Sequence, residues 1–327
     1  MSQSIAGGNL LSLNGLSREA LLEVLDTAES FVEVNQRTIK KVPALKGRVV
    51  ASLFFEESTR TRLSFETAAK RLSADVLSLA VASSSVKKGE SLYDTISTID
   101  ALGIDAVVMR HSSSGAAEQV SRYVPHVRVI NAGDGLHQHP TQGLLDVFTV
   151  RQVLAERNNA LGSETGSDLF KGLKVLIVGD IRHSRVARSD IAAYSALGAE
   201  VRVAAPGTLM PADMSGWPVS VAEDFEEALQ WADVVGLLRL QRERGTGSFV
   251  PSLSEFTQTF GLTSERQRLL KPEAIIMHPG PMNRGVEIDS RVADSTQAVI
   301  TRQVSNGVPV RMAVLYLTVA GSKEETK

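Results

Sequence analysis

The sequence contains no cysteine in its 327 residues, and aromatic residues make up only 5% of it. The absence of cysteine excludes disulfide bonds, thiolate zinc sites and cysteine nucleophiles, and it is typical of proteins that work in a reducing compartment. No apolar run approaches the roughly 18 residues of a membrane-spanning helix, and the N-terminal segment lacks the basic start and apolar core of a signal peptide. We therefore expect a cytoplasmic protein with no membrane partner.

An excess of charge of either sign is also missing, because 35 basic and 37 acidic residues leave a formal net charge of −2. Such a chain has no overall basic field to hold nucleic acid, so any anion site must be local. The histidines are scattered: His137 and His139 lie two residues apart, but no histidine or acidic partner stands at the spacing of helical metal ligands. The sequence predicts neither a nucleic-acid partner nor a metal, and we expect no cofactor.

Short β-branched runs alternate with segments of helical periodicity along most of the chain, a pattern that predicts parallel sheets flanked by helices. With 43% hydrophobic residues, the chain is long enough for two domains with separate cores. The polar, glycine-rich segment 157–172 marks their boundary. We predict an α/β fold with domains at 1–156 and 157–304, joined by interdomain helices, and a C-terminal helix at 305–327 that packs back on the first domain.

The predicted elements rest on local patterns. Strands are predicted at 48–55, 76–79, 105–109, 127–130, 174–178, 200–204, 234–238 and 274–277. Helices are predicted at 91–102, 140–156 and 184–197. The apolar segment 296–320 is interrupted by Gly307 and Pro309, so we expect two helices that meet at a bend.

The segment Glu56–Glu66 (EESTRTRLSFE) comes after a predicted strand and opens a helix. Unpaired N–H groups and the partial positive charge of a helix start attract anions. The hydroxyl and guanidinium groups that add to this attraction belong to Ser58, Thr59, Arg60 and Thr61. These residues are candidates for a phosphate cradle. The alternative is that a hydroxyl only caps the helix while the arginines face solvent, and Arg62 is left to that alternative.

The segment His137–Gln142 (HQHPTQ) stands at the start of a long predicted helix. Pro140 favours the first helical position, which places His139 just before the helix and Gln142 in its first turn. A neutral imidazole and an amide at a strand end could bind a planar carbonyl and its amino group. A histidine that only caps the helix or is satisfied in the core is the alternative.

Three arginines, Arg110, Arg185 and Arg239, stand at or just past predicted strand ends. Open α/β sheets bind ligands at this edge, and arginine binds carboxylate or phosphate through two hydrogen bonds, although each could instead be a surface ion-pair residue. The segment Ser83–Ser91 (SSSVKKGES) is either an anion-binding loop or a solvated one. The turn Met277–Ile288 is rich in proline and glycine, so its backbone can approach a ligand closely.

Taken in chain order, the motifs STRTR, KKGE, RH, HPTQ, VGD with its following arginine, LLRLQRER and HPGPMNRG resemble those of the aspartate carbamoyltransferase family. The resemblance implies an enzyme that transfers the carbamoyl group of carbamoyl phosphate to the amine of L-aspartate, giving N-carbamoyl-L-aspartate and phosphate, an early step of pyrimidine biosynthesis. Related ornithine enzymes carry a cysteine-containing HCLP motif, so the absence of cysteine favours aspartate. Two positions depart from the pattern: Gly280 replaces a leucine of some relatives, and HSSSG replaces His-Pro after Arg110.

Residue by residue, the resemblance implies two substrate sites and a shared subunit boundary. The residues implied for carbamoyl phosphate are Ser58, Thr59, Arg60, Thr61, Arg110, His139, Gln142, Gly280 and Pro281. Those implied for aspartate are Lys88, Arg185, Arg239 and Gln241. Ser84 and Lys88 look like residues that enter a neighbouring subunit's site, which implies a homotrimer. A regulatory chain or a dihydroorotase partner is left open.

The implied chemistry is direct attack of the deprotonated amine through a tetrahedral intermediate. The groups expected to stabilise its oxyanion are those of Arg60, Thr61, Arg110 and His139. Positive side chains from both domains offset the repulsion between two anionic substrates, and domain closure is expected on binding. We expect His139 to donate as a neutral imidazole. Loss of all chemistry in His139→Ala, with carbamoyl phosphate binding and site geometry intact, would instead favour a general base.

Two rival functions belong to other classes. The run KVLIVGD and the helix after it are similar to the nucleotide-binding turn of a dinucleotide-dependent oxidoreductase. However, VGDIRHSR has one glycine where the fingerprint GxGxxG has three. The second rival is an inactive scaffold that binds a partner enzyme of the same pathway, and a carbamoylation assay separates it from an enzyme.

Overall fold

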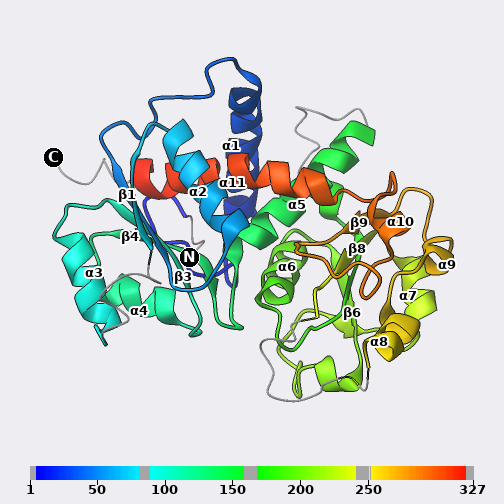
Figure 1. Ribbon diagram of the computed structural model, residues 1–327. Coiled ribbons are helices and arrows are strands. Elements are labelled where there is room, and N and C mark those ends of the chain that lie inside the picture. The colour runs from blue at the N-terminus through cyan, green and yellow to red at the C-terminus, as the bar shows by residue number, and fades with distance from the viewer. Residues whose placement is uncertain (1–4, 81–88, 158–167, 241–249, 251, 322–327) are drawn as a thin grey trace. The chain divides into compact units, whose positions relative to one another are not determined.

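The computed structural model describes residues 5–80, 89–157, 168–240, 250 and 252–321. The chain divides into two compact units (Figure 1). Unit 1 comprises Met1–Leu145 and Val304–Lys327, and unit 2 comprises Asp146–Gln303. Each unit contains one parallel sheet flanked by helices, which confirms the predicted α/β class.

Unit 1 is built on a four-stranded parallel sheet in the order β2-β1-β3-β4. Its strands are β1 (Val49–Phe54), β2 (Asp75–Ala80), β3 (Ala106–His111) and β4 (Arg128–Asp134). Its helices include α1 (Arg18–Gln36), α2 (Thr59–Arg71), α3 (Leu92–Asp100) and α4 (Ala116–Tyr123). Each strand predicted for this half of the chain overlaps an observed strand.

Alternation along the strands of unit 1 directs side chains to two faces of the sheet. Leu53 of β1 and Met109 of β3 pack in one buried cluster with Ile96 of α3 and Val120 of α4. Gly103 follows the end of α3, and its φ of +77° is in the left-handed region that glycine tolerates. Burial of this apolar face fixes the sheet and therefore the position of the strand ends.

Unit 2 is built on a five-stranded parallel sheet in the order β7-β6-β5-β8-β9. Its strands are β5 (Lys174–Val178), β6 (Glu200–Ala204), β7 (Ser220–Val221), β8 (Val234–Leu237) and β9 (Ile275–Met277). Its helical segments are α6 (Arg185–Ala196), η4 (Gly207–Leu209), α7 (Phe225–Trp231), α8 (Leu253–Phe260), α9 (Ser264–Gln267) and α10 (Ser290–Ala293). The short edge strand β7 was not predicted, because two residues are too few to form a recognisable pattern.

Helices cover both faces of the unit 2 sheet. Leu176 and Val178 of β5 belong to a buried cluster that includes Leu229 of α7. The intervening residue Ile177 instead lines a cavity together with Tyr194 of α6. Figure 1 shows α6 and α7 on opposite sides of this sheet. Both faces are therefore buried, as expected for parallel strands that read as continuous apolar runs.

Two long helices, α5 (Pro140–Arg157) and α11 (Ile300–Ala320), each contribute residues to both units. The prediction of two helices meeting at a bend was wrong, because α11 is one helix with Pro309 inside it. Proline removes one backbone donor, but Met312 and Leu315, among others beyond it, are fully buried. Tertiary packing therefore outweighs the local breaking signal. None of the helices in the described ranges combines the length and apolarity needed to cross a bilayer.

Candidate active site

Unit 1 presents its candidate residues at the carboxyl ends of three neighbouring strands. Phe54 of β1 stands in register with Arg110 of β3, and the Phe55 amide donates to the Arg110 carbonyl at 2.9 Å. His111 of β3 stands in register with Asp134 of β4. Because the strands are parallel, Arg110 and the segments that open α2 and α5 lie at the same edge of the sheet.

The start of α2 is open to solvent. Ser58 is the N-cap residue, with an extended φ of −158°, and in the described structure its side chain makes no capping hydrogen bond. Thr59 and Arg60 are exposed, whereas Thr61 is buried. The Ser58 hydroxyl is thus not used as a cap, and the helix start favours an anion through its N–H groups and dipole.

Glu56 orients Arg110. The Nε atom of Arg110 donates to Oε2 of Glu56 at 3.2 Å, and the two side chains are only 14% and 23% exposed. Partial burial makes this pair stronger than an ion pair on an open surface. The sequence predicts no role for Glu56, because the two residues are 54 positions apart and no local pattern links them.

His111 lies beside this pair, and its burial favours the neutral imidazole. Burial lowers the pKa of His111 from its ordinary value, although the nearby Glu56 and Asp134 carboxylates oppose the shift. Its Nδ1 accepts the Ser113 amide at 2.9 Å, and its ring packs on Phe55 with 4.9 Å between centroids. The imidazole therefore brings no additional charge to this edge of the sheet.

The loop that leads to His139 is held by the buried carboxylate of Asp134, whose side chain is 3% exposed. Its Oδ1 accepts the Asn131 side-chain amide at 2.8 Å and the Gln138 backbone amide at 3.1 Å. Its Oδ2 accepts the Gly115 amide at 2.6 Å. A charged acceptor with several donors fixes the backbone before α5. Sequence reasoning missed Asp134, because an aspartate in a glycine-rich turn is ordinarily a turn residue.

His139 and Gln142 are positioned by the start of α5, as Pro140 predicts. The Gln142 amide donates to the His139 carbonyl at 2.9 Å, which closes the first turn. Both side chains are buried, at 4% and 8% exposure. They are therefore held in fixed positions beyond the end of β4.

Unit 2 places Arg185 at the start of α6, one short loop after β5. Ser184 caps this helix and accepts the Ala187 amide at 3.1 Å. Asp180 accepts the His183 backbone amide at 3.1 Å and lies 2.8 Å from His183 Nδ1. Arg185 itself is buried. Hydrogen bonds thus fix both the loop before Arg185 and the first turn of α6 after it.

Arg239 comes two residues after the end of β8, the strand adjacent to β5 in the sheet. The Leu238 amide donates to the Val178 carbonyl at 2.8 Å. Gly179 has a φ of +123°, and a Cβ there would meet the Leu238 carbonyl oxygen at 2.8 Å, so this approach requires glycine. The structure therefore brings Arg185 and Arg239 to one edge of the unit 2 sheet, as predicted from their strand ends.

The strand β9 ends at the same edge and leads into the turn that contains Gly280 and Pro281, which are joined by a cis peptide bond. The side chain of His278 is fully buried; its Nδ1 accepts the Gly280 amide at 2.8 Å and its Nε2 lies 3.2 Å from Glu287 Oε1. The same Glu287 oxygen accepts the Asn283 amide at 2.5 Å. The buried side chains of His278 and Glu287 thus fix the backbone of this turn through hydrogen bonds.

Ser84, Lys88 and Gln241 lie outside the described residues, so the roles predicted for them stay predictions. Within the described ranges, no three histidine, cysteine, aspartate or glutamate side chains gather closely enough to hold a metal ion.

These features define a class of protein with two α/β units. In each unit the sheet is parallel, and arginine and hydrogen-bonding groups lie at the carboxyl edge of that sheet. Two domain profiles of one family match the chain. The aspartate/ornithine carbamoyltransferase carbamoyl-P binding domain matches residues 8–152, and the Asp/Orn binding domain matches residues 171–318. The chain belongs to the aspartate/ornithine carbamoyltransferase family.

Individual relatives agree with this membership. The aspartate carbamoyltransferase catalytic subunit of Thermobifida fusca (strain YX) is 51% identical over 314 residues, which cover 96% of each protein. Aspartate transcarbamoylase from Trypanosoma cruzi in complex with carbamoyl phosphate and aspartate superposes with a TM-score of 0.82 at 30% identity, covering 98% of this chain and 99% of that one. The complex of the same enzyme with N-(phosphonacetyl)-L-aspartic acid gives a TM-score of 0.80 at 30% identity, with 96% of both chains covered.

Proposed function

We propose that this chain transfers the carbamoyl group of carbamoyl phosphate to the amine of L-aspartate, giving N-carbamoyl-L-aspartate and phosphate, as an early step of pyrimidine biosynthesis. One observation carries the proposal: in this member of the family, groups suited to bind anions lie at the carboxyl edge of each sheet. The relatives bound to carbamoyl phosphate, aspartate and the phosphonacetyl analogue support the same substrate pair here.

In the proposed site, unit 1 binds carbamoyl phosphate. The open helix start from Ser58 to Thr61 receives the phosphate, because its N–H groups, hydroxyls and the Arg60 guanidinium all donate. Arg110, held by Glu56, and the imidazole and amide of His139 and Gln142 bind the carbamoyl end. Arg110 is held by its ion pair with Glu56, and His139 and Gln142 are held by burial, so these three donors need little reorganisation on binding.

Unit 2 binds aspartate in this proposal. Arg185, at the start of the helix that follows β5, and Arg239, just past the adjacent strand β8, match the two carboxylates of the substrate. The predicted contacts of Gln241 and Lys88 to aspartate belong to the same proposal. The backbone at Gly280 and Pro281 contacts the carbamoyl group, and the buried pair beneath the turn keeps that backbone in place.

The reaction needs no covalent enzyme intermediate. The lone pair of the deprotonated amine attacks the carbamoyl carbon, a C–N bond forms, and the oxyanion is stabilised by Arg60, Thr61, Arg110 and His139. The C–O bond to phosphate then breaks, and the leaving phosphate takes a proton from the nitrogen. Fixed positions for both reactants convert a bimolecular attack into an effectively intramolecular one.

The test of this function is an acceptor panel. Purified protein is given carbamoyl phosphate with L-aspartate, ornithine or their acetylated analogues, and both phosphate release and the carbamoylated product are measured. Product with aspartate alone is the expected result. Product with ornithine would redirect the assignment within the family, and no product with any acceptor would favour the scaffold.

We propose further that the working unit is a cytoplasmic homotrimer whose sites take Ser84 and Lys88 from a neighbour. The complete absence of cysteine, typical of reducing compartments, supports the location. Lys88→Ala chains and Arg60→Ala chains, each inactive alone, are expected to regain up to about a quarter of wild-type activity when mixed as equal, randomly assembled trimers. Refolded mixtures are checked by native mass spectrometry. Verified mixed trimers without any recovery would contradict shared sites.

A further inference from the structure

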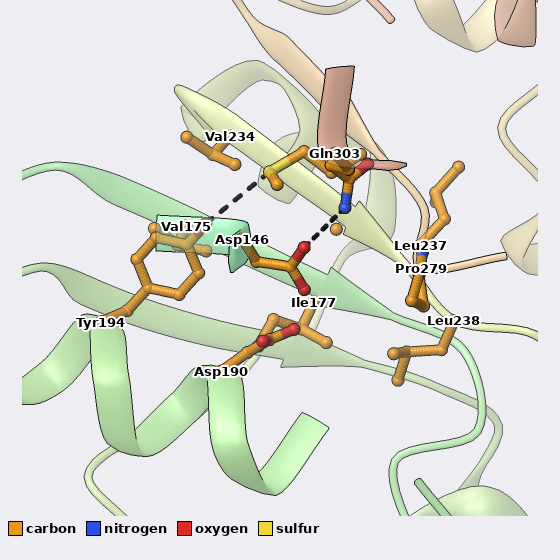
Figure 2. A pocket seen from close by; sticks show the side chains of 12 residues that line it. Asp146, Val175, Ile177, Asp190, Tyr194, Val234, Leu237, Leu238, Pro279 and Gln303 are labelled. Carbon is orange, nitrogen blue, oxygen red and sulfur yellow. Dashed lines mark hydrogen bonds between the residues drawn. The ribbon is translucent and has the colours of Figure 1, made fainter. Parts of the chain in front are cut away.

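A small cavity in unit 2 is enclosed by α5, α6, α11 and the sheet (Figure 2). Its volume is about 10 Å³, whereas pockets for small-molecule ligands typically hold about 300 Å³ or more. The cavity is therefore not a substrate site. Its main feature is that two carboxyl groups, those of Asp146 on α5 and Asp190 on α6, lie next to each other in its wall.

The two carboxyl groups are in direct contact. Asp190 shares a hydrogen bond with Asp146, and Oδ1 of Asp146 also accepts the Gln303 side-chain amide at 2.7 Å. Asp146 and Asp190 are 3% and 7% exposed. Oδ1 of Asp190 has no donor among the described residues. Two adjacent buried carboxylates cannot both be ionised without a large cost, so the pair retains one proton.

We assign that proton to Asp190, because Asp146 accepts a hydrogen bond from Gln303 whereas no described donor reaches Oδ1 of Asp190. Burial, together with the charge of Asp146, raises the pKa of Asp190 well above its ordinary value. Tyr194 of α6 is the other titratable group that lines the cavity, and burial with the two carboxylates raises its pKa as well. Its hydroxyl donates to Met277 Sδ at 3.7 Å. Among the described lining residues there is no lysine, arginine or histidine to compensate a second negative charge.

A hydrogen-bonded chain leads from this pair to the turn at Gly280. Gln303 of α11, which donates to Asp146, accepts the His278 backbone amide on its own Oε1 at 3.0 Å. His278 in turn accepts the Gly280 amide at 2.8 Å. On the other side, Asp190 lies on α6, five positions after Arg185 at the start of that helix.

We propose that the Asp146–Asp190 pair is a positioning device that, while it holds one proton, ties the helix starting at Arg185 to the turn at Gly280. This inference rests on the proposed function for the role of Arg185 in binding aspartate. The existence of the protonated pair does not depend on that function. When Asp190 releases its proton to hydroxide, two adjacent carboxylates repel, α6 moves away from α5, and Arg185 loses its alignment. Aspartate affinity therefore falls as the pH rises.

The experiment measures dicarboxylate binding across pH. Succinate has no amine, so its own charge is constant above pH 7, and the difference between the wild-type and D190N curves isolates the effect of the pair from that of the phosphate. For the wild type with phosphate present, calorimetry between pH 7 and 10 is expected to show Kd rising toward about tenfold per pH unit above the pKa of the pair, as linkage to one proton requires. D190N, which keeps a donor but cannot ionise, is expected to hold Kd within about threefold over that range.

Two further variants separate the loss of the Asp146–Asp190 hydrogen bond from the general effect of removing a negative charge from unit 2. D190A removes the hydrogen bond and is expected to raise the succinate Kd about tenfold already at pH 7, while phosphate binding changes less than about twofold. D213N removes an exposed carboxylate of the same unit and should show the wild-type pH curve. Thermal unfolding measured beside these assays is expected to give D190N a higher Tm than wild type, with a gap that widens as the pH rises.

The pair is also observed directly, independently of catalysis. Carbon-13 NMR of labelled aspartate is expected to show one carboxyl that is still protonated at pH 7 and missing in D190N. A fully ionised Asp190 at pH 7, a wild-type Kd that is flat to pH 10, or the same rise in D190N as in wild type would each overturn the inference. If no acceptor gave product in the acceptor panel, the proposed function would be refuted instead. The NMR result would still show whether Asp190 carries the proton.

Discussion

Arg60→Ala is expected to lower kcat about 10²- to 10³-fold, because removal of one preorganised oxyanion donor typically costs about 3 to 4 kcal/mol. Arg60 is exposed in the first turn of α2, so its removal leaves the core intact and the loss should appear without a change in Tm. Steady-state kinetics with carbamoyl phosphate and aspartate, each varied against saturating partner, measure the effect.

Arg62→Ala is the matched control for this variant. Arg62 lies in the same helix, two residues on; its side chain is 46% exposed, with Nε 3.9 Å from Glu66. An exposed ion pair of this length contributes little, so kcat is expected to stay within about twofold of wild type. Equal losses in the two variants would show that α2 responds to any loss of positive charge, and the cradle assignment would then fail.

Arg239→Ala is expected to raise the KM for aspartate roughly 10- to 100-fold, since a hydrogen bond to a charged group contributes about 1.5 to 3 kcal/mol. Carbamoyl phosphate affinity should change less than about twofold, because its proposed contacts other than the turn at Gly280 and Pro281 belong to unit 1. Kinetics at varied aspartate, with separate binding of carbamoyl phosphate by calorimetry, test the two statements together.

Arg291→Ala serves as control for Arg239→Ala. Arg291 is an exposed arginine on α10 of the same unit, and no site role is predicted for it. Its removal should leave the KM for aspartate within about twofold of wild type. If Arg239→Ala weakened carbamoyl phosphate and aspartate equally, the assignment of Arg239 to the acceptor carboxylate would be wrong.

The sequence was sufficient to locate the strands and the arginines at their carboxyl ends. Apolar β-branched runs located β5 at Lys174–Val178 without error, and Pro140 placed the start of α5. Once parallel strands are predicted, their carboxyl ends share an edge, so Arg185 and Arg239 could be expected together. These predictions succeed because they depend on residues that are near in sequence or on a general rule of sheet topology.

The sequence was insufficient where distant residues decide the outcome. Pro309 predicts a break by local rules, yet burial of the surrounding residues keeps α11 whole. Glu56 orients Arg110, and Asp146 meets Asp190, across separations that carry no period or motif. Such contacts exist only after the chain has folded, and they supply the positioning rather than the chemistry of the site.

The proton retained by Asp190 has a consequence for the whole molecule. The formal net charge of −2 counts every aspartate as ionised, so the folded chain is less negative than its composition states while Asp190 keeps this proton. The unfolded chain, in contrast, releases this proton above the ordinary aspartate pKa of 3.8. Because the folded state binds the extra proton, the stability contributed by this pair is complete in acid and is lost as the pH rises through the folded pKa. Unfolding at a pH between the unfolded and the folded pKa thus releases this proton to the solution.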